Sequence, residues 1–472
     1  MAYTSLSEFI DKLISAHEII VITEPVDVRL EITEIVDRFS KSADYNKALL
    51  FTNTGTDFPV LINALGSDRR MAFALNLDSL DDLTININRI VDSLLVKPQG
   101  FMGKLKKIPK LAQIARWMPK KTVGKGKCQE EVLEVVDLEA LPILQCWPLD
   151  GGPFITLPSV HTVDPTTGIS NVGMYRMQVF DRYTTGMHWH KHKTGATHFE
   201  SYKKLGLKMP IAVTLGGDPA YTFSATAPLP ENIDEYLLAG FLRNKAVKLV
   251  KCLTNDLWIP EDVDFVIEGY IDPKEPLVTE GPFGDHTGFY SLADLYPKMH
   301  VTVISHRKNA VYPTTIVGIP PMEDAYISTA TERLFTPLIS LSIAPEVIDM
   351  HMPIWGVAHN LVLVSIKKQY EGQAFKVAQA FWGAGQMMFN KALIVFDSDV
   401  DLRDYNALIK IIVKNLVSSS QIMLSKGPID VLDHSTNVAG MGGKVCIDCT
   451  AQLDIASNDE FSFNYLYERS YE

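Results

Sequence analysis

The middle of the sequence constrains the fold most, because residues 132–304 contain many short runs of β-branched and aromatic residues separated by Gly, Pro and Asp. Such runs occur at 154–158, 172–180, 211–215 and 247–253. Short strands at this density predict a β-rich barrel or sandwich. One helix, expected over 232–242, interrupts the series.

Both flanking regions alternate between helical and extended patterns, which indicates α/β domains. Before the β-rich region we expect helices at 5–16, 29–42 and 80–95, and strands at 19–23 and 49–52. After it we expect strands at 361–366 and 391–396, and helices at 371–382 and 406–417. The prediction is an α+β chain of 472 residues in three domains, which cover 1–127, 128–306 and 307–472.

The charge balance restricts the partners. With 44 basic and 56 acidic residues the net charge is −12, which argues against a nucleic-acid binder. The N-terminus has no basic region before an apolar run, and no apolar stretch approaches the ~20 residues that span a bilayer. We therefore expect a cytoplasmic protein. The basic segment 104–127 fits an amphipathic surface helix that touches acidic lipid or a partner, or a solvated linker with one packed face.

The five cysteines lie at positions 128, 146, 252, 446 and 449. An odd and sparse set fits a reducing compartment better than a disulfide framework. Cys446 and Cys449 have metal-ligand spacing, but no second CxxC pair exists to complete a zinc site. We expect both to be core residues.

Residues 280–290, EGPFGDHTGFY, place two carboxylates and a histidine on a backbone rich in glycine and proline. Such a segment favours a turn over a helix or a central strand. Glu280 and Asp285 can then face one cavity, where one carboxyl group would keep its proton near neutral pH and act as a general acid. The alternative is a solvated turn.

The run 171–176, NVGMYR, ends in a guanidinium that could hold a substrate carboxylate by two contacts. The alternative is an arginine on the solvent face of a strand. Regular alternation would put Asn171 and Arg176 on opposite faces, unless a bulge intervenes or the site wraps the strand.

The run 188–192, HWHKH, would place three imidazoles on one face of a strand, where they could bind a metal. Without a flanking cysteine or carboxylate, one ligand among His188, His190 and His192 is the better interpretation. The turn 150–156 offers free backbone donors suited to phosphate or a flavin edge. Residues 224–230, which lead to Glu235, offer carbonyls and a carboxylate suited to a hard cation.

Taken in order, the glycine pair, NxGxYR, the downstream histidine, PxP before a glutamate, and EGPFGD resemble the UbiD family of prenylated-FMN-dependent decarboxylases. The resemblance extends over nearly the whole chain, to residues 444–450. It implies a split β-barrel flavin-binding domain, an N-terminal α/β domain and a C-terminal α/β oligomerisation domain. It also implies a carboxy-lyase that removes CO2 reversibly.

The resemblance also implies residue roles. Asn171, His192 and Glu235 would ligate Mn²⁺ or Mg²⁺ that bridges to the flavin phosphate, and K⁺ would lie nearby. The cofactor-binding positions would be Thr156, Asn171, Arg176, Ser224, Ala225, Ala227 and Lys391.

The catalytic positions implied by the resemblance are Arg176, Glu280 and Asp285. Protonated Glu280 would deliver a proton to the carbon that loses CO2, Arg176 would orient the carboxylate, and Asp285 would tune the network. The flavin would accept electron density from that carbon.

The substrate implied is a 4-hydroxy-3-polyprenylbenzoate or a menaquinone-pathway naphthoate, as in quinone biosynthesis, and a small phenolic acid is the alternative. A flavin prenyltransferase would supply the cofactor to a homo-oligomer, a dimer or a hexamer. A lipid-tailed substrate would give segment 104–127 a role in peripheral contact with the inner membrane surface. Outside this class, the alternatives are a split-barrel flavin reductase and a metal-dependent hydrolase built on HxHxH.

Overall fold

The computed structural model describes residues 2–95, 114–191, 193–230, 233–357, 359–416 and 418–451. The chain divides into two compact units, residues 1–337 with 431–439 and residues 338–430 with 440–472. The boundaries expected for three domains stay a prediction. Residues 104–113 of the basic segment 104–127 lie outside the described residues.

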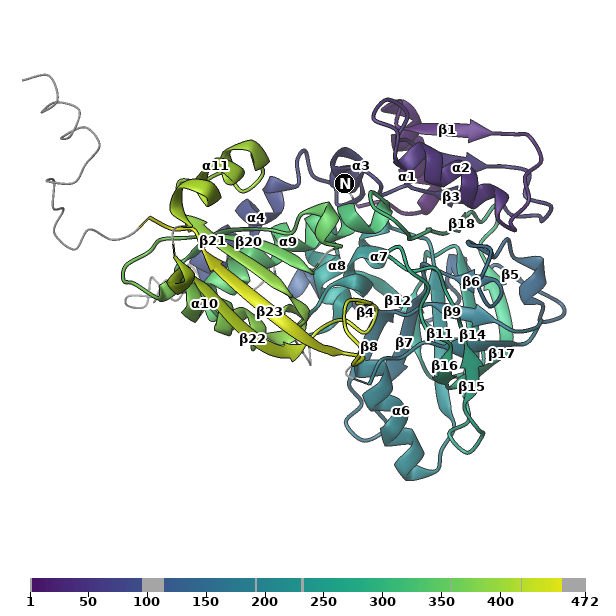
Figure 1. The fold of residues 1–472 in the computed structure, drawn as a ribbon. Coiled ribbons are helices and arrows are strands. Elements are labelled where there is room, and N and C mark those ends of the chain that lie inside the picture. The colour runs from purple at the N-terminus through teal and green to yellow at the C-terminus, as the bar shows by residue number, and fades with distance from the viewer. Residues whose placement is uncertain are drawn as a thin grey trace, which may run out of the picture. The chain divides into compact units, whose positions relative to one another are not determined.

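The first unit begins with a small α/β region (Figure 1). Its elements are α1 (Leu6–Ser15), β1 (Ile19–Ile22), α2 (Glu31–Ser40), β2 (Ala48–Phe51), β3 (Val60–Ile62), α3 (Asp68–Ala74) and α4 (Asp81–Leu95). Ser5 caps α1 by accepting a hydrogen bond from Glu8 N, and the helix buries its apolar side. The sheet order is β1-β2-β3-β18, in which β18 (Tyr312–Pro313) comes from far along the chain.

The central region is a curled antiparallel sheet. Its strands are β5 (Glu131–Val132), β6 (Phe154–Ile155), β7 (Ser159–Val163), β8 (Ser170–Met174), β9 (Met177–Val179), β10 (Thr184–Met187), β11 (Met209–Leu215), β14 (Phe265–Ile271) and β17 (Lys298–His306). They follow the order β6-β9-β10-β17-β14-β11-β7-β8, with β5 paired to β17.

The connection from β8 to β9 requires this sheet to curl. β8 forms one edge of the order, and β9 lies next to the opposite edge. Only Tyr175 and Arg176 separate the two strands, so Met174 and Met177 are at most about 11 Å apart. The two sides of the sheet therefore approach each other, which confirms the expected split β-barrel.

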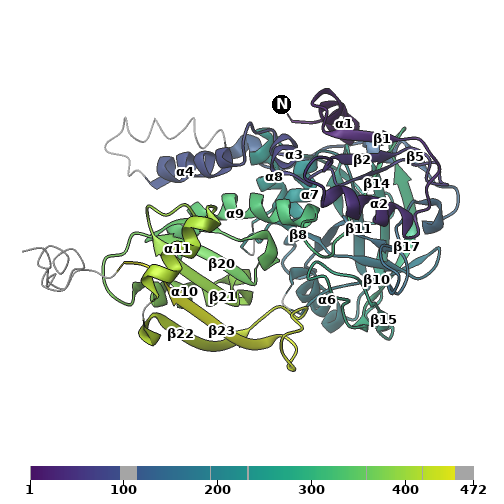
Figure 2. The same ribbon diagram turned by 45° about the horizontal axis from the view of Figure 1, so that its top comes forward.

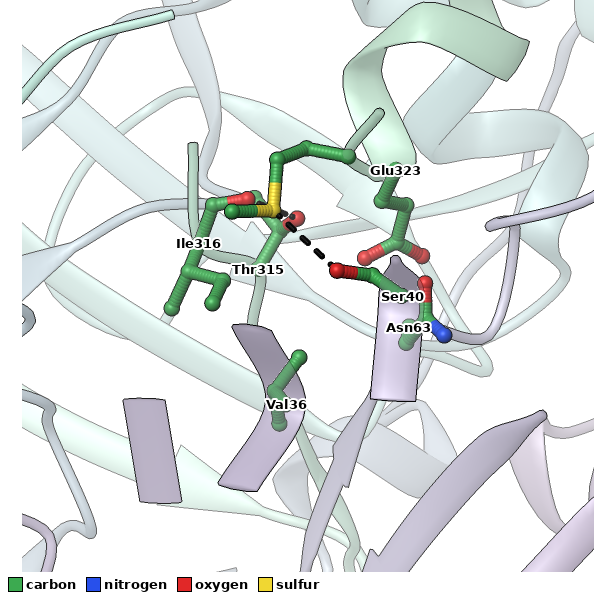
Figure 3. A pocket seen from close by; sticks show the side chains of 7 residues that line it. Val36, Ser40, Asn63, Thr315, Ile316 and Glu323 are labelled. Carbon is green, nitrogen blue, oxygen red and sulfur yellow. Dashed lines mark hydrogen bonds between the residues drawn. The ribbon is translucent and has the colours of Figure 1, made fainter. Parts of the chain in front are cut away.

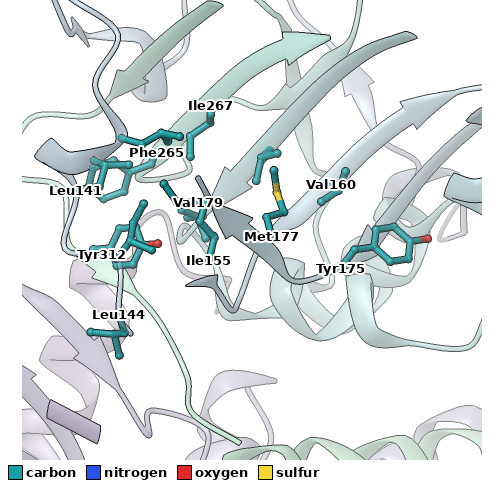
Figure 4. Close-up of a cluster of buried hydrophobic side chains, with 14 of the residues drawn as sticks. Leu141, Leu144, Ile155, Val160, Tyr175, Met177, Val179, Phe265, Ile267 and Tyr312 are labelled. Carbon is teal, nitrogen blue, oxygen red and sulfur yellow. The ribbon is translucent and has the colours of Figure 1, made fainter. Parts of the chain in front are cut away.

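Apolar side chains fill the interior of this sheet. Figure 4 shows members of the cluster, among them Ile155, Val160, Met177, Phe265 and Ile267, which are all fully buried. They come from four different strands, β6, β7, β9 and β14. Burial of this set stabilises the curl that brings β8 and β9 together.

Three helices and two small sheets complete the first unit. They comprise α6 (Thr194–Leu205), α7 (Pro219–Thr226), α8 (Glu235–Arg243), β4 (Lys120–Lys121), β12 (Lys248–Lys251), β13 (Trp258–Pro260), β15 (Val278–Glu280) and β16 (Asp294–Tyr296). Asp218 caps α7 and Asp234 caps α8. α7 packs against both β8 and α8 (Figure 2).

α9 (Glu323–Ser342) runs from the first unit into the second, whose further elements are β19 (Val347–His351), β20 (Leu361–Ile366), α10 (Gln373–Trp382), β21 (Ala392–Asp397), α11 (Tyr405–Asn415), β22 (Ile422–Pro428) and β23 (Met441–Asp448). The sheet order is β19-β20-β21-β23-β22, with a parallel centre. Cys446 and Cys449 are fully buried in its two apolar clusters, as predicted. Within the described residues, no helix is both long and apolar enough to span a bilayer.

Candidate active site

The segment 280–291 forms a hairpin loop between β15 and β16. Glu280 is the last residue of β15 and pairs with Asp294. Gly281 has φ +92°, a value that favours glycine, and its bond to Pro282 is cis. The predicted turn is therefore present.

A second turn holds this loop from behind. Gly151 N donates to Pro282 O at 2.8 Å, and Gly284 N donates to Asp150 Oδ1 at 2.7 Å. Gln178 bridges both turns, because its amide donates to Gly151 O and accepts from Gly281 N, each at 2.7 Å. The expectation that the donors of this turn are free was wrong for Gly151, which fastens the loop.

Arg176 lies in the break between β8 and β9 and reaches the loop. Its Nε donates to Glu280 Oε1 at 2.9 Å and its Nη2 to Glu280 Oε2 at 3.3 Å. Its Nη1 forms an ion pair with Asp285 Oδ2. Because the strand ends before Arg176, alternation no longer fixes its direction, which answers the question of faces left open by the sequence.

Further contacts fix the guanidinium. Nη2 also donates to Ser291 Oγ at 2.9 Å, and Cζ lies 4.7 Å from the centre of the Phe283 ring. Ser291 Oγ in turn accepts from Phe283 N at 3.1 Å. The two-point contact predicted for a substrate carboxylate is thus made with Glu280.

Glu280 has one further partner, His188. The distance from His188 Nδ1 to Glu280 Oε2 is 2.8 Å. The Glu280 side chain is 0% exposed. His188 also lies 4.4 Å from Tyr296, ring centre to ring centre.

Both carboxylates favour the ionised form. Burial raises the pKa of Glu280, but the hydrogen bond with His188 and the charge of Arg176 outweigh it, so the pKa lies below its ordinary value. Burial likewise raises the pKa of Asp285, but His286 and Arg176 bring it well below the usual range. The expectation that one acid keeps its proton in this arrangement was wrong, because the argument omitted the cation between them.

The histidine run does not form the expected strand. β10 ends at Met187, and α6 begins at Thr194. His188 Nε2 lies 2.8 Å from His190 Nε2, while His188 Nδ1 faces Glu280. His192 lies outside the described residues, so its role as a metal ligand stays a prediction.

Two predicted metal ligands come together where β8, α7 and α8 pack. Glu235 Oε2 accepts from the backbone nitrogen of Val172, the residue after Asn171, at 3.0 Å. Burial raises the pKa of Glu235 to about 7, and no cationic side chain of the described residues offsets that effect. The Asn171 side chain lies beside Tyr175, and the hydroxyl of Ser224 on α7 is buried without a hydrogen-bond partner among the described residues.

The buried Glu235 carboxylate fits a cation, because a buried carboxylate needs a positive partner, and the Asn171 amide oxygen could be a second oxygen ligand. The described residues contain no group of three or more His, Cys, Asp or Glu side chains that could hold a metal ion. The proposed ligand set is not such a group, because Asn171 is an amide and His192 lies outside the described residues.

The remaining cofactor positions are engaged in internal contacts. Thr156 Oγ1 lies 2.8 Å from Thr314 Oγ1 and donates to Thr315 O at 2.7 Å. Ala225 is buried, and Ala227 N donates to Ser224 O at 3.3 Å. Lys391 precedes β21 in the second unit, where its carbonyl accepts from Val445 N. The roles of these residues stay predictions.

A separate small hollow, without room for a water molecule, lies between α2, β3 and the start of α9 (Figure 3). It is lined by Val36, Ser40, Asn63, Thr315, Ile316, Met322 and Glu323. Glu323 Oε1 accepts from Leu65 N at 2.6 Å, and burial raises the pKa of this carboxyl group. With no basic side chain in its lining, the hollow is unsuited to an acid substrate.

Large apolar side chains are exposed on or beside the loop, and we call them the apolar rim: Leu149, Phe289, Leu292, Leu295 and Ile319. Leu292 is 76% exposed and Leu149 66%. Leu149 N donates to Tyr290 OH at 3.2 Å, and a Cβ on Gly288 would lie 2.8 Å from Ile319 Cγ1. Exposed apolar groups of this size are typical of binding surfaces.

The sequence matches three family models of 3-octaprenyl-4-hydroxybenzoate carboxy-lyase: the N-terminal domain at 10–87, the Rift-related domain at 120–320 and the C-terminal domain at 325–449. A relative from Aquifex aeolicus (strain VF5) is 47% identical over 95% of this chain and 92% of its own length. A relative from Archaeoglobus fulgidus is 44% identical with the same coverage.

Solved structures agree with these matches. The vanillic acid decarboxylase of Sedimentibacter hydroxybenzoicus, in closed form, has a TM-score of 0.85 and 26% identity, covering 100% of this chain and 99% of that one. The UbiD-class enzyme HmfF from Pelotomaculum thermopropionicum, in complex with FMN, has a TM-score of 0.80 and 23% identity, covering 98% and 99%. At that identity the second shows the fold alone.

The fold, the site and these matches define the class of protein as a prenylated-FMN-dependent decarboxylase, a carboxy-lyase. The chain belongs to the UbiD family.

Sequence reasoning missed two residues that hold the site together, Gln178 and Ser291, and it named His188 only as a possible metal ligand and not as a partner of Glu280. For Gln178 strand alternation gives no signal, because Arg176 lies in the break before β9. For Ser291 no sequence signal exists, because its role depends on how the loop folds back.

Proposed function

We propose that this protein decarboxylates an aromatic acid that carries a large apolar substituent, a 4-hydroxy-3-polyprenylbenzoate or a naphthoate of the menaquinone pathway. The observation that carries the proposal is the apolar rim beside the loop that holds Glu280 and Asp285. A small phenolic acid would leave these side chains in water, whereas a tail or a second ring would cover them.

The residues divide the chemistry between them. The substrate carboxylate competes with Glu280 for the Arg176 guanidinium, which forms an ion pair with Glu280 in the absence of substrate. Once Arg176 turns to the substrate, its charge favours ionised Glu280 less, so the pKa of Glu280 rises and the residue takes up a proton. Glu280 then protonates the carbon that has lost CO2, while Asp285 keeps the guanidinium in place.

Prenylated FMN, when bound, supplies the electron sink for the carbon that bears the carboxylate. We propose that Asn171, His192 and Glu235 hold Mn²⁺ or Mg²⁺ at the flavin phosphate, with K⁺ at carbonyls around Ser224, Ala225 and Ala227. The buried Glu235 carboxylate, bonded to the residue after Asn171, and the buried unpaired hydroxyl of Ser224 support this arrangement. Thr156 and Lys391 are the further cofactor contacts of the proposal.

A substrate series tests the proposal. The protein, co-expressed with a flavin prenyltransferase, is given 4-hydroxybenzoates with zero, one or two isoprenoid units, a hydroxynaphthoate, and vanillate. We expect kcat/KM to rise at least about 10-fold for each added unit, or for the second ring, because buried methylenes stabilise the complex. Equal or better use of vanillate would contradict the assignment.

Two variants assign the preference to the apolar rim. Leu292→Asp should reduce the gain from each isoprenoid unit without changing turnover of vanillate. The matched control is Leu205→Asp, because Leu205 is also exposed, at 52%, but lies on α6. If both variants respond alike, the rim does not select the substrate.

A further inference from the structure

Glu280 needs a source for the proton that it delivers. The groups around its carboxylate limit which source is possible. Within the described part of the chain, its oxygens form hydrogen bonds with Arg176 Nε, Arg176 Nη2 and His188 Nδ1 alone. Water does not reach the side chain, which is 0% exposed. Arginine does not give up a proton in proteins, so of these two described partners it is His188 that can supply one.

We propose that His188 is the positioning residue that hands Glu280 the proton used in the reaction. The inference rests on the proposed function, because it concerns the proton that replaces the lost carboxylate. The side chain of His188 is 12% exposed, so a proton can enter at His188 and leave from Nδ1 toward Glu280 Oε2, 2.8 Å away.

The proton balance of the step is simple. His188 that carries protons on both nitrogens transfers the Nδ1 proton to the Glu280 carboxylate, which leaves neutral imidazole and a carboxylic acid. Glu280 then gives this proton to the substrate carbon, which takes it with the electron pair of the broken bond to CO2. Over one turnover, one substrate carboxylate and one proton from water become CO2 and the protonated product.

The groups that face His188 are Glu280, Arg176, Asp285, His190 and Tyr296. Burial and the charge of Arg176 lower the pKa of His188, whereas the hydrogen bond with Glu280 raises it, and the net pKa is below its ordinary value. An imidazolium formed here is therefore a strong acid. Once Arg176 turns to the substrate, the Nδ1 proton of this imidazolium moves readily to Glu280.

The first test is kinetic and uses His188→Asn in the protein loaded with prenylated FMN. The asparagine amide can still donate to Glu280 from nearly the same place, but it cannot pass a proton on. We expect kcat to fall about 100-fold with KM changed less than about threefold, and a larger solvent deuterium isotope effect. In His188→Ala, added imidazole should restore part of the rate.

The matched control is His300→Asn. His300 also pairs with a carboxylate, Glu275, at 2.8 Å, and it lies on β17 outside the site. We expect His300→Asn to have the same kcat as the wild type. Wild-type kcat in His188→Asn would overturn the inference while leaving the decarboxylase assignment intact.

The second test needs no turnover. Nitrogen-15 NMR of histidine-labelled protein, with His188 assigned from His188→Asn, reports which ring nitrogen carries the proton. A proton on Nδ1 at pH 7.5, and a lower His188 pKa in Glu280→Gln, support the inference. A bare Nδ1 that only accepts would overturn it, even if every acid of the substrate series is decarboxylated. If the wild type decarboxylates none of the acids in the substrate series, the proposed function is rejected. The NMR result on which nitrogen of His188 carries the proton would still decide whether His188 can donate to Glu280.

Discussion

Arg176 determines the ionisation of the site, because it is the cation between two buried carboxylates. Its Nε and Nη2 hold Glu280, and its Nη1 holds Asp285. Burial by itself raises the pKa of both acids, and the guanidinium contributes to reversing that effect in each. Removing this one side chain should therefore change both stability and its dependence on pH.

Arg176→Gln should lower the free energy of unfolding by about 3–5 kcal/mol at pH 7, the usual cost of leaving a buried charge unpaired. In the wild type, the lowered pKa values stabilise the fold above pH ~4, and this stabilisation is lost as the pH falls further. In the variant, burial is opposed only by His188 at Glu280 and His286 at Asp285, so both pKa values are higher than in the wild type and protonation relieves the penalty at a higher pH. The difference between the two proteins should thus shrink from pH 7 to pH 5, as measured by urea unfolding.

Arg182→Gln serves as the control for the loss of an arginine. Arg182 pairs with Glu139 at 2.9 Å, but both side chains are exposed. Its urea midpoint should match that of the wild type, because exposed ion pairs contribute little. A pH-independent gap between Arg176→Gln and the wild type would contradict the role given to Arg176.

At this scale the sequence predicted which acids share a turn but not how they are held. Glu280 and Asp285 lie on one glycine-rich turn, as their neighbours require. Their meeting with Arg176, 104 residues before Glu280, depends on the curled sheet and was reached only through the family resemblance. The role of His188 was missed because the HxHxH spacing was interpreted as a strand.

The hairpin loop and the turn behind it act as one element. Gly151 approaches the loop so closely that a Cβ at this position would lie 2.4 Å from Gly281 O. The neighbouring atom is backbone, so it can yield only if the loop moves. Gly151→Ala should therefore lower stability by about 1–3 kcal/mol and displace Glu280, with a loss of kcat of about 100-fold.

Gly443→Ala is the matched control, because a Cβ at Gly443 meets nothing within 4 Å. It lies on β23 and should leave both melting temperature and kcat unchanged. A Gly151→Ala protein with full activity and an unchanged melting temperature would show that the loop tolerates displacement.

The sequence predicted the helices and strands that have a clear hydrophobic periodicity. It did not predict the interruption between β8 and β9. The strand expected at 361–366 is β20, and the helix expected at 371–382 contains α10. The run 172–180 was interpreted as one strand, yet it divides at Tyr175 and Arg176 into β8 and β9. Both residues suit a strand, so the break is imposed by the curl of the sheet and not by local preference.

The packed elements β8, α7 and α8 should bind a divalent cation. Asn171→Ala should weaken Mn²⁺ binding at least about 10-fold, because even the outer-shell partners of metals have effects of that size. Isothermal titration of the full chain with Mn²⁺ in the presence of FMN measures the change. The control is Asn86→Ala, whose amide contacts Arg89 on α4. Equal affinity in Asn171→Ala and the wild type would remove Asn171 from the metal site.

At the scale of the whole molecule, the curled sheet gathers segments that the sequence keeps apart. The site combines the turn at 150–152, the break at 175–176, His188 beyond β10 and the loop at 280–291. The sequence indicated a β-rich barrel from strand density. It could not indicate that β8 and β9 lie at opposite sides of the sheet order, because that depends on long-range pairing.

The central claim is that Glu280 protonates the carbon from which CO2 leaves. Its most direct test is product formation in D2O by the protein loaded with prenylated FMN, read by NMR for wild type and Glu280→Gln. The account predicts wild-type product with one deuterium at the carbon that held the carboxylate, and product formation slower by at least about 100-fold in Glu280→Gln. Product formed by Glu280→Gln at the wild-type rate would contradict it.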